Sequence, residues 1–158
     1  MQSSTRGMEV ILDTHAIREI LLNSSKEQLN KILKAIKERC HTLVIPRLEK
    51  EHRIRLDFSQ FLQLTMKFRT KLHGKFIPST EPESDSYFPS ELIKVLRKCR
   101  ADDNDIIIAR VAYRRARTTK RKALIVSDDE SFHECEPFLR RYNIEVKYVE
   151  EFLKFIIV

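Results

Sequence analysis

The sequence predicts one α/β domain of three layers, α/β/α, with a central parallel sheet of four to five strands. Short apolar segments alternate along the chain with longer segments whose apolar residues recur at helical spacing. That alternation is typical of a parallel sheet covered by helices on both faces. The length of 158 residues suits a single domain, which we place at residues 9–158, after a short disordered lead-in at residues 1–8.

Four segments rich in apolar and β-branched residues are expected to be strands. They are EVILD, TLVI, ALIVS and IEVKYV, at residues 9–13, 42–45, 123–127 and 144–149. Lys75–Ile77 could add a further short strand. It begins a stretch, residues 75–90, that contains three prolines and a run of Ser and acidic residues, so the remainder of that stretch is expected to be a loop or lid.

The segments between the strands carry apolar residues at helical spacing. Helices are therefore expected at residues 14–23, 26–40, 57–73, 90–100, 105–117, 131–142 and 150–157. Pro46 suits the first turn of another helix, which would carry Glu49 and Glu51. The apolar stripe of Phe58–Leu72 is expected to pack in the core or at a dimer face.

Composition excludes some functions and indicates others. The chain has only two glycines, so a glycine-rich phosphate loop or dinucleotide fingerprint is not possible. Its net charge is +7 and its pI about 9.4. Nucleic acid is the commonest polyanion for such a basic domain, although the charge could also serve solubility alone.

Three cysteines without tight spacing, Cys40, Cys99 and Cys135, predict no disulfide framework and favour a reducing, cytoplasmic compartment. Two of them have a neighbouring His, but the spacing matches no common zinc module. No apolar run approaches the ~18 residues of a membrane span, so no membrane partner is expected.

Four acidic residues lie at the ends of apolar segments: Asp13, Glu51, Asp105 and Asp129. Each alone could be a helix cap or a solvated side chain. Asp13 and Asp129, however, follow strong strands, and ligands of parallel sheets bind beyond the carboxyl ends of the strands. Clustered carboxylates repel one another unless a cation intervenes, and Mg²⁺ or Mn²⁺ prefers such oxygen ligands.

The order of these motifs resembles the PIN-domain ribonucleases over roughly residues 9–149. VILDT matches their first strand, which ends in Asp13 followed by Thr14. IPRLEKEH matches the second motif at Glu51, with Glu49 as a rival. DIIIARVA matches the third at Asp105, with Asp102 and Asp103 as rivals. VSDDESF matches the last, through Ser127, Asp129 and Phe132.

The resemblance implies a metal-dependent endoribonuclease that hydrolyses RNA with one or two Mg²⁺ or Mn²⁺ ions. It implies Asp13, Asp105 and Asp129 as metal ligands, with Glu51 holding a second ion or the attacking water. Thr14 and Ser127 would orient these groups, and Asp128 could add a ligand. The family includes prokaryotic toxins, which pair with an antitoxin protein, and RNA-processing enzymes, and it makes a homodimer an expectation.

A basic run between residues 110 and 122 is expected to bind the RNA backbone. Its members are Arg110, Arg114, Arg115, Arg117, Lys120, Arg121 and Lys122. A solvated helix face is the simpler interpretation, and the helix that begins at Asp105 would end ~18 Å from it.

Three other kinds of protein are alternatives to the nuclease. A catalytically inactive RNA-binding or scaffold protein could keep the same fold. A phosphoacceptor signalling domain would need a second acid beside Asp13, and a D-x-D phosphatase would need an Asp where His15 stands. Both of the latter therefore fit poorly.

Overall fold

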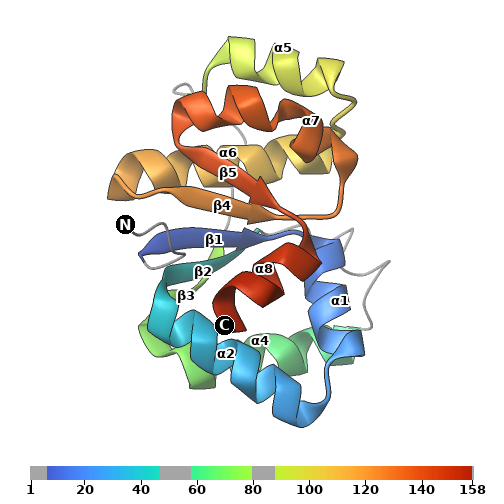
Figure 1. Cartoon of the computed structure of the whole chain (residues 1–158), viewed down its shortest axis with the longest axis vertical. Coiled ribbons are helices and arrows are strands. Elements are labelled where there is room, and N and C mark those ends of the chain that lie inside the picture. Colours follow the sequence, from blue (N-terminus) through green and yellow to red (C-terminus); the bar gives the residue numbers. More distant parts are fainter. Residues whose placement is uncertain (1–6, 47–57, 80–87, 158) are drawn as a thin grey trace.

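The computed structural model of the chain describes residues 7–46, 58–79 and 88–157. Within these ranges five strands form one parallel sheet. The strands are β1 (Met8–Leu12), β2 (Cys40–Pro46), β3 (Phe76–Ser79), β4 (Ala123–Val126) and β5 (Ile144–Lys147). The helices are α1 (Thr14–Asn23), α2 (Lys26–Arg39), α4 (Phe58–Leu72), α5 (Ser90–Lys98), α6 (Asp103–Thr119), α7 (Glu130–Leu139) and α8 (Val149–Ile157). The predicted three-layer α/β/α fold is confirmed (Figure 1).

The order of the strands determines where a ligand can bind. The sheet runs β3-β2-β1-β4-β5, so the chain builds outward from β1 to β3 and then returns to the other side of β1 for β4 and β5. Strand order therefore reverses between β1 and β4, and the loops that leave their carboxyl ends diverge. Leu12 pairs with Val126. Asp13 and Ser127, which follow these two residues, therefore lie side by side at the carboxyl ends of β1 and β4.

Alternate side chains of each strand pack against opposite layers. In β1, Val10 and Leu12 belong to the core shared with α1, α2, α4 and α8, whereas Ile11 belongs to the core shared with α5, α6 and α7. The period of two in a strand requires this division. Since β1 is buried on both faces, its carboxyl end is held in place from both sides of the sheet.

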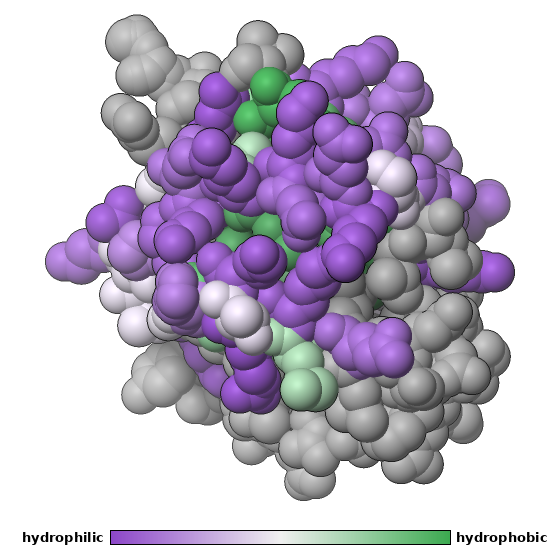
Figure 2. Space-filling model, turned by 90° about the horizontal axis from the view of Figure 1, so that it is seen from below, coloured by the Kyte–Doolittle hydropathy of each residue, from purple (hydrophilic) through white to green (hydrophobic). Residues whose placement is uncertain are grey.

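The helices are amphipathic, and they turn their polar sides to solvent. In α2, Leu29, Ile32, Leu33 and Ile36 are buried at helical spacing. Figure 2, which views the molecule from the side where α2 lies, shows mainly hydrophilic side chains with smaller apolar areas between them. In α4, Phe68 and Leu72 are in the core and Met66 is exposed. No helix of the described residues has both the length and the apolar character that a bilayer crossing requires.

Some element boundaries differ from the prediction at the amino ends. The first strand begins at Met8 and not at Glu9; Met8 is buried, so the lead-in cannot extend to residue 8. Lys75–Ile77 was only an optional strand, and β3 forms at Phe76–Ser79. Pro46 ends β2, where it pairs with Ser79. The helix expected to begin there, with Glu49 and Glu51, falls on residues outside the described ranges.

Two helices also differ from the prediction. Asp105 does not open its helix: Asp102 is the N-cap of α6, and Asp105 is the third residue. The helix expected at 131–142 ends at Leu139 and is followed by a 3-10 turn at Arg140–Tyr142. Pro137 lies within its last turn, and a proline removes the N–H that the helix would use there.

The cysteine prediction was wrong, because Cys99 and Cys135 form a disulfide. They are 36 residues apart in sequence, and only the packing of α5 against α7 brings their Cα atoms within 6.2 Å. The inference of a reducing compartment therefore loses its basis. The disulfide also removes Cys135 from any zinc site, and Cys40 is buried.

Removing this disulfide is expected to lower the free energy of unfolding by about 3–4 kcal/mol, because a cross-link across 36 residues restricts the unfolded chain. The comparison is between the Cys99→Ala/Cys135→Ala variant and the wild type in urea denaturation. Cys40→Ala is a control for the loss of a buried thiol alone. Equal stability of the double variant and the wild type would show that the two thiols are unpaired in solution.

Candidate functional site

A pocket of about 240 Å³ opens at the carboxyl edge of the sheet, where strand order reverses. Its lining is dominated by carboxylates: Asp13, Asp102, Asp105, Asp128 and Asp129, with His15 and Ile108. Three of the four acids predicted as ligands therefore meet in one place, although they are far apart in sequence. The fourth, Glu51, and its rival Glu49 lie outside the described residues.

Asp13 is held at the junction between β1 and α1. Its side chain is only 8% exposed, and its Oδ1 accepts a hydrogen bond of 2.7 Å from the backbone N–H of Ala16. Its backbone N–H donates to the carbonyl of Val126 in β4. The carboxylate is thus an N-cap, and it is fixed to both central strands. Thr14, which follows, is fully buried.

The loop after β4 positions two further carboxylates. Asp129 is the N-cap of α7, with its Oδ1 2.8 Å from the backbone N–H of Ser131. The Ser127 hydroxyl accepts from the Asp129 backbone N–H at 3.0 Å. Asp128 accepts from the Val149 N–H at 2.9 Å, and its other oxygen lies 3.2 Å from Nε2 of His15. Ser127 was expected to hydrogen-bond a carboxylate or a metal-bound water, whereas this contact of its hydroxyl is with the backbone of Asp129.

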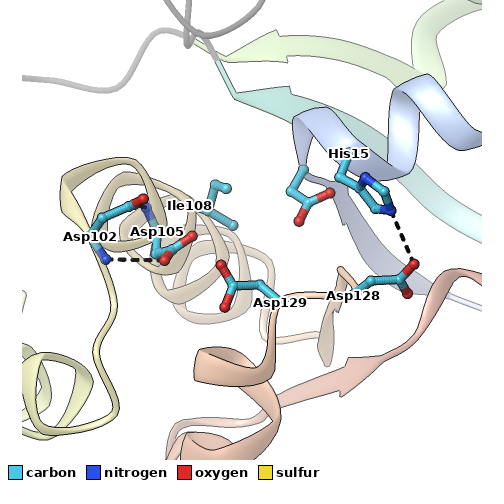
Figure 3. A pocket seen from close by; sticks show the side chains of 7 residues that line it. His15, Asp102, Asp105, Ile108, Asp128 and Asp129 are labelled. Atoms are coloured by element: carbon cyan, nitrogen blue, oxygen red, sulfur yellow. Dashed lines mark hydrogen bonds and ion pairs between the residues drawn. The ribbon is translucent and has the colours of Figure 1, made fainter. Parts of the chain in front are cut away.

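Asp105 enters the pocket from α6. Its Oδ2 accepts from the Asp102 backbone N–H at 3.1 Å, and its own N–H donates to Oδ1 of Asp102 at 2.8 Å. This reciprocal capping box fixes the first turn of the helix. Figure 3 shows Asp105, in the first turn of α6, and Asp129, in the loop before α7, projecting toward the same space, with the His15–Asp128 contact to one side. Asp103, the other rival, is 88% exposed and pairs with Arg97, so it points away from the site.

One carboxyl group of the pocket, that of Asp105, has a strongly shifted pKa. The pKa of Asp105 is raised from 3.8 to about 7, first because the carboxyl is buried and then because Asp129 and Asp102 repel its charge. The hydrogen bond from the Asp102 backbone opposes this shift. A carboxyl group that ionises only near pH 7 is the expected result of burying an acid, with further acids beside it adding to the shift.

The raised pKa predicts a pH dependence of stability. Between pH 4 and 7 the folded protein holds a proton on Asp105 that the unfolded chain has released, so the free energy of unfolding falls as pH rises through this range. The measurement is the thermal midpoint of the metal-free protein at several pH values, compared with the Asp105→Asn variant. The difference between the two proteins should change across this window, and a constant difference would contradict the raised pKa.

Helix capping alone does not explain the arrangement. Asp13 and Asp129 each cap a helix, as the simpler interpretation of single acids anticipated, and the cap of α6 is Asp102 in place of Asp105. A cap uses one carboxylate oxygen, however, and it does not require that three capped helices begin around one pocket. Asp105 is buried, and as the third residue of α6 it uses one carboxylate oxygen in the capping box with Asp102. Its burial has an electrostatic cost that a purely structural role would leave uncompensated.

The basic run lies along the length of α6 and beyond it. Arg110 stacks over the Phe88 ring at 5.4 Å, and Arg117 donates to the Tyr113 hydroxyl. Arg121 lies against the carbonyl of Gly7, and Lys122 pairs with Glu145 at 3.0 Å. Lys120 is the exposed, left-handed cap of α6, and Arg114 is partly buried.

Arg115 has a different environment from its neighbours. Its guanidinium pairs with Glu9 of β1 at 2.6 Å, and Glu9 is fully buried. The helix it belongs to has 17 residues and is about 25 Å long, and Lys120–Lys122 precede the amino end of β4. Much of the basic run therefore lies toward the amino ends of the strands, whereas the acid pocket lies at their carboxyl ends. Several of its charged side chains already contact other residues of the protein.

No protein-family model matches the chain, and a search of curated proteins finds no match either. The resemblance to PIN-domain ribonucleases therefore rests on the four motifs alone. The geometry of the pocket is evidence on function that does not depend on this resemblance.

The donor set of the pocket fits a hard divalent cation. Its donors are carboxylate oxygens, which Mg²⁺ and Mn²⁺ prefer, and a cation would offset the repulsion that raises the pKa of Asp105. Within residues 7–46, 58–79 and 88–157, no three His, Cys, Asp or Glu side chains already stand in coordination geometry. Metal binding by these carboxylates would therefore require their side chains to move.

Proposed function

We propose that the protein is a metal-dependent endoribonuclease whose active site is the acid pocket between β1 and β4. The observation that carries the proposal is the convergence of Asp13, Asp105 and Asp129 from three elements that are distant in sequence. Their position at the reversal of strand order is where parallel sheets bind ligands. A bound cation would favour the ionised form of Asp105, whose pKa is raised by burial and by Asp129, and the +7 chain is suited to a polyanionic substrate.

In the proposed site, Asp13, Asp105 and Asp129 hold Mg²⁺ or Mn²⁺. Bound there, the ion supplies a Lewis acid that activates water and offsets the charge of the phosphate. Residues of the chain position the proposed metal ligands. The buried junction after β1 fixes Asp13, and the Ser127 hydroxyl fixes the backbone of Asp129. Glu51 keeps its proposed role of holding a second ion or the attacking water.

The acid-rich pocket also limits how RNA can approach. Phosphate groups are repelled by the carboxylates until a cation is bound, so metal and RNA should bind with positive coupling. RNA affinity is therefore expected to rise when a divalent ion is added. Ca²⁺ suits this measurement because it prefers oxygen ligands and allows binding to be compared apart from cleavage.

The proposal is tested by incubating the protein with single-stranded RNA in the presence of Mn²⁺, Mg²⁺ or EDTA. Internal cleavage is expected only with a metal ion, and Asp13→Asn should abolish it. RNA binding without cleavage under every metal condition would instead support the inactive RNA-binding or scaffold protein. Absence of both binding and cleavage would contradict both functions.

A further inference from the structure

A pair of stacked aromatic rings lies beside the acid pocket. The rings of His133 on α7 and Tyr148, just beyond β5, are parallel to within 8°, with their centroids 3.5 Å apart. Both side chains are partly exposed. A flat pair of rings at the surface, next to a row of carboxylates, is not needed to close the hydrophobic core, whose residues lie elsewhere.

The pair is connected to the pocket by hydrogen bonds. Nε2 of His133 donates to the carbonyl of Ser127 at 2.7 Å, immediately before Asp128. The backbone N–H of Val149, the residue after Tyr148, donates to Oδ1 of Asp128. His133 itself contacts the loop that carries Asp128 and Asp129, and Tyr148 is followed by a residue, Val149, that contacts the same loop.

The Tyr148 ring is also fixed in orientation. Its hydroxyl donates to the Glu130 carboxylate, with oxygens at 2.9 and 3.1 Å, and its backbone N–H donates to Glu151 at 3.1 Å. A ring held at both ends loses little conformational entropy when a ligand stacks on it. Single-stranded nucleic acids are bound by stacking of their bases on such aromatic side chains.

We infer that the His133–Tyr148 pair is a stacking platform for a nucleobase of the substrate, next to the phosphodiester in the acid pocket. The base lies against the face of Tyr148 that is turned away from His133. This inference rests on the proposed nuclease function and adds the substrate class: a strand with an unpaired, accessible base close to the cleavage position. Stacking is tolerant of sequence, because every base has a flat face.

The chain offers a matched control for Tyr148. Tyr142 and Tyr148 flank β5: Tyr142 lies before its amino end and Tyr148 follows its carboxyl end, where the pocket opens. Each is partly exposed and donates its hydroxyl to a glutamate, Glu91 or Glu130. The hydrogen bond to that glutamate raises the pKa of both phenols. Replacing either removes a similar ring, but only one of them lies beside the pocket.

The test compares two RNA decamers of equal length and charge, one with bases and one built of abasic residues. Dissociation constants are measured with Ca²⁺. The wild-type protein is expected to bind the normal decamer more tightly by about 5- to 100-fold, the value of one stacked base. Tyr148→Leu should lose most of that preference, whereas Tyr148→Phe and Tyr142→Leu should keep it.

Several outcomes would overturn the inference. The inference would be wrong if the Tyr148→Leu variant kept the full preference for the decamer with bases. It would also be wrong if the variant bound both decamers more weakly by the same factor. The Mn²⁺ affinity of the Tyr148→Leu variant is measured as well, because it separates the stacking platform from the nuclease proposal. Metal binding and cleavage with an unchanged base preference would reject the platform alone. If the wild type binds neither Mn²⁺ nor RNA, the nuclease proposal fails, and the platform fails with it.

Discussion

Replacing Asp105 with asparagine is expected to abolish metal-dependent cleavage while leaving the metal-free protein as stable as the wild type or more so. Asp105 is 7% exposed, and burial and its acidic neighbours raise its pKa to about 7. Asparagine removes the charge that causes this conflict. Its side-chain oxygen can still accept the hydrogen bond from the Asp102 backbone, so the helix start is preserved.

The loss of activity should be large because Asp105 is a proposed ligand. Changes to residues that merely support a metal ligand cost about 10–100-fold in affinity or activity, so loss of a ligand should exceed about 100-fold. The measurements are Mn²⁺ affinity by calorimetry, the cleavage rate, and the thermal midpoint without metal at pH 8. A variant that binds metal and cleaves as the wild type does would remove Asp105 from the site.

Asp103→Asn is the matched control for this experiment. Asp103 lies two residues earlier on the same helix, and the change is chemically identical. Its carboxylate is 88% exposed and pairs with Arg97 on α5. Exposed pairs contribute little to stability, about 0–1 kcal/mol, so this variant should keep metal affinity, cleavage and stability close to those of the wild type.

Replacing Arg115 with leucine is expected to destabilise the protein by about 3–5 kcal/mol, because the buried Glu9 would lose its closest cation and, among the described residues, keep only His41, 3.8 Å from its Oε2. Glu9 is fully buried, and Arg115 contacts its Oε1 through both Nε, at 2.7 Å, and an Nη, at 2.6 Å. Thr42 donates to the same oxygen, but a hydroxyl does not replace the positive charge. Urea denaturation at pH 7 measures the loss.

A second substitution isolates the cause. Glu9→Gln in the Arg115→Leu background removes the unpaired charge and keeps an acceptor for Thr42, so it should recover part of the lost stability. Arg117→Leu, two residues further along α6, is the control, since Arg117 is exposed and donates to Tyr113. If Arg115→Leu were as stable as this control and weakened only RNA binding, Arg115 would be a substrate contact as the sequence first suggested.

The layers of the fold could be predicted from sequence because they depend on local periodicity. Strands such as EVILD and ALIVS are short, apolar and followed by helices with clear apolar stripes, and the parallel sheet follows from that alternation. The meeting of Asp13 with Asp129 was also predictable. Asp13 directly follows β1 and Asp129 lies three residues beyond the end of β4, and these two strands are neighbours in the sheet.

Other features depend on tertiary contacts that no local pattern reveals. The Cys99–Cys135 disulfide forms because α5 packs against α7, and the spacing of the cysteines does not signal it. The pairing of Arg115 with Glu9 is of the same kind: Arg115 appears in sequence as one of seven basic residues, and only the packing of α6 over β1 brings it to a buried acid. The stacking of His133 on Tyr148 likewise joins two separate elements.

The most direct measurement is anomalous diffraction from crystals soaked in Mn²⁺. The account predicts a strong peak in the pocket between β1 and β4, with carboxylate oxygens of Asp13, Asp105 and Asp129 at about 2.0–2.3 Å from the ion. Crystals of Asp105→Asn, soaked in parallel, should lose or weaken that peak. Saturating Mn²⁺ that leaves the pocket empty, or that binds only at other places on the surface, would contradict the nuclease site.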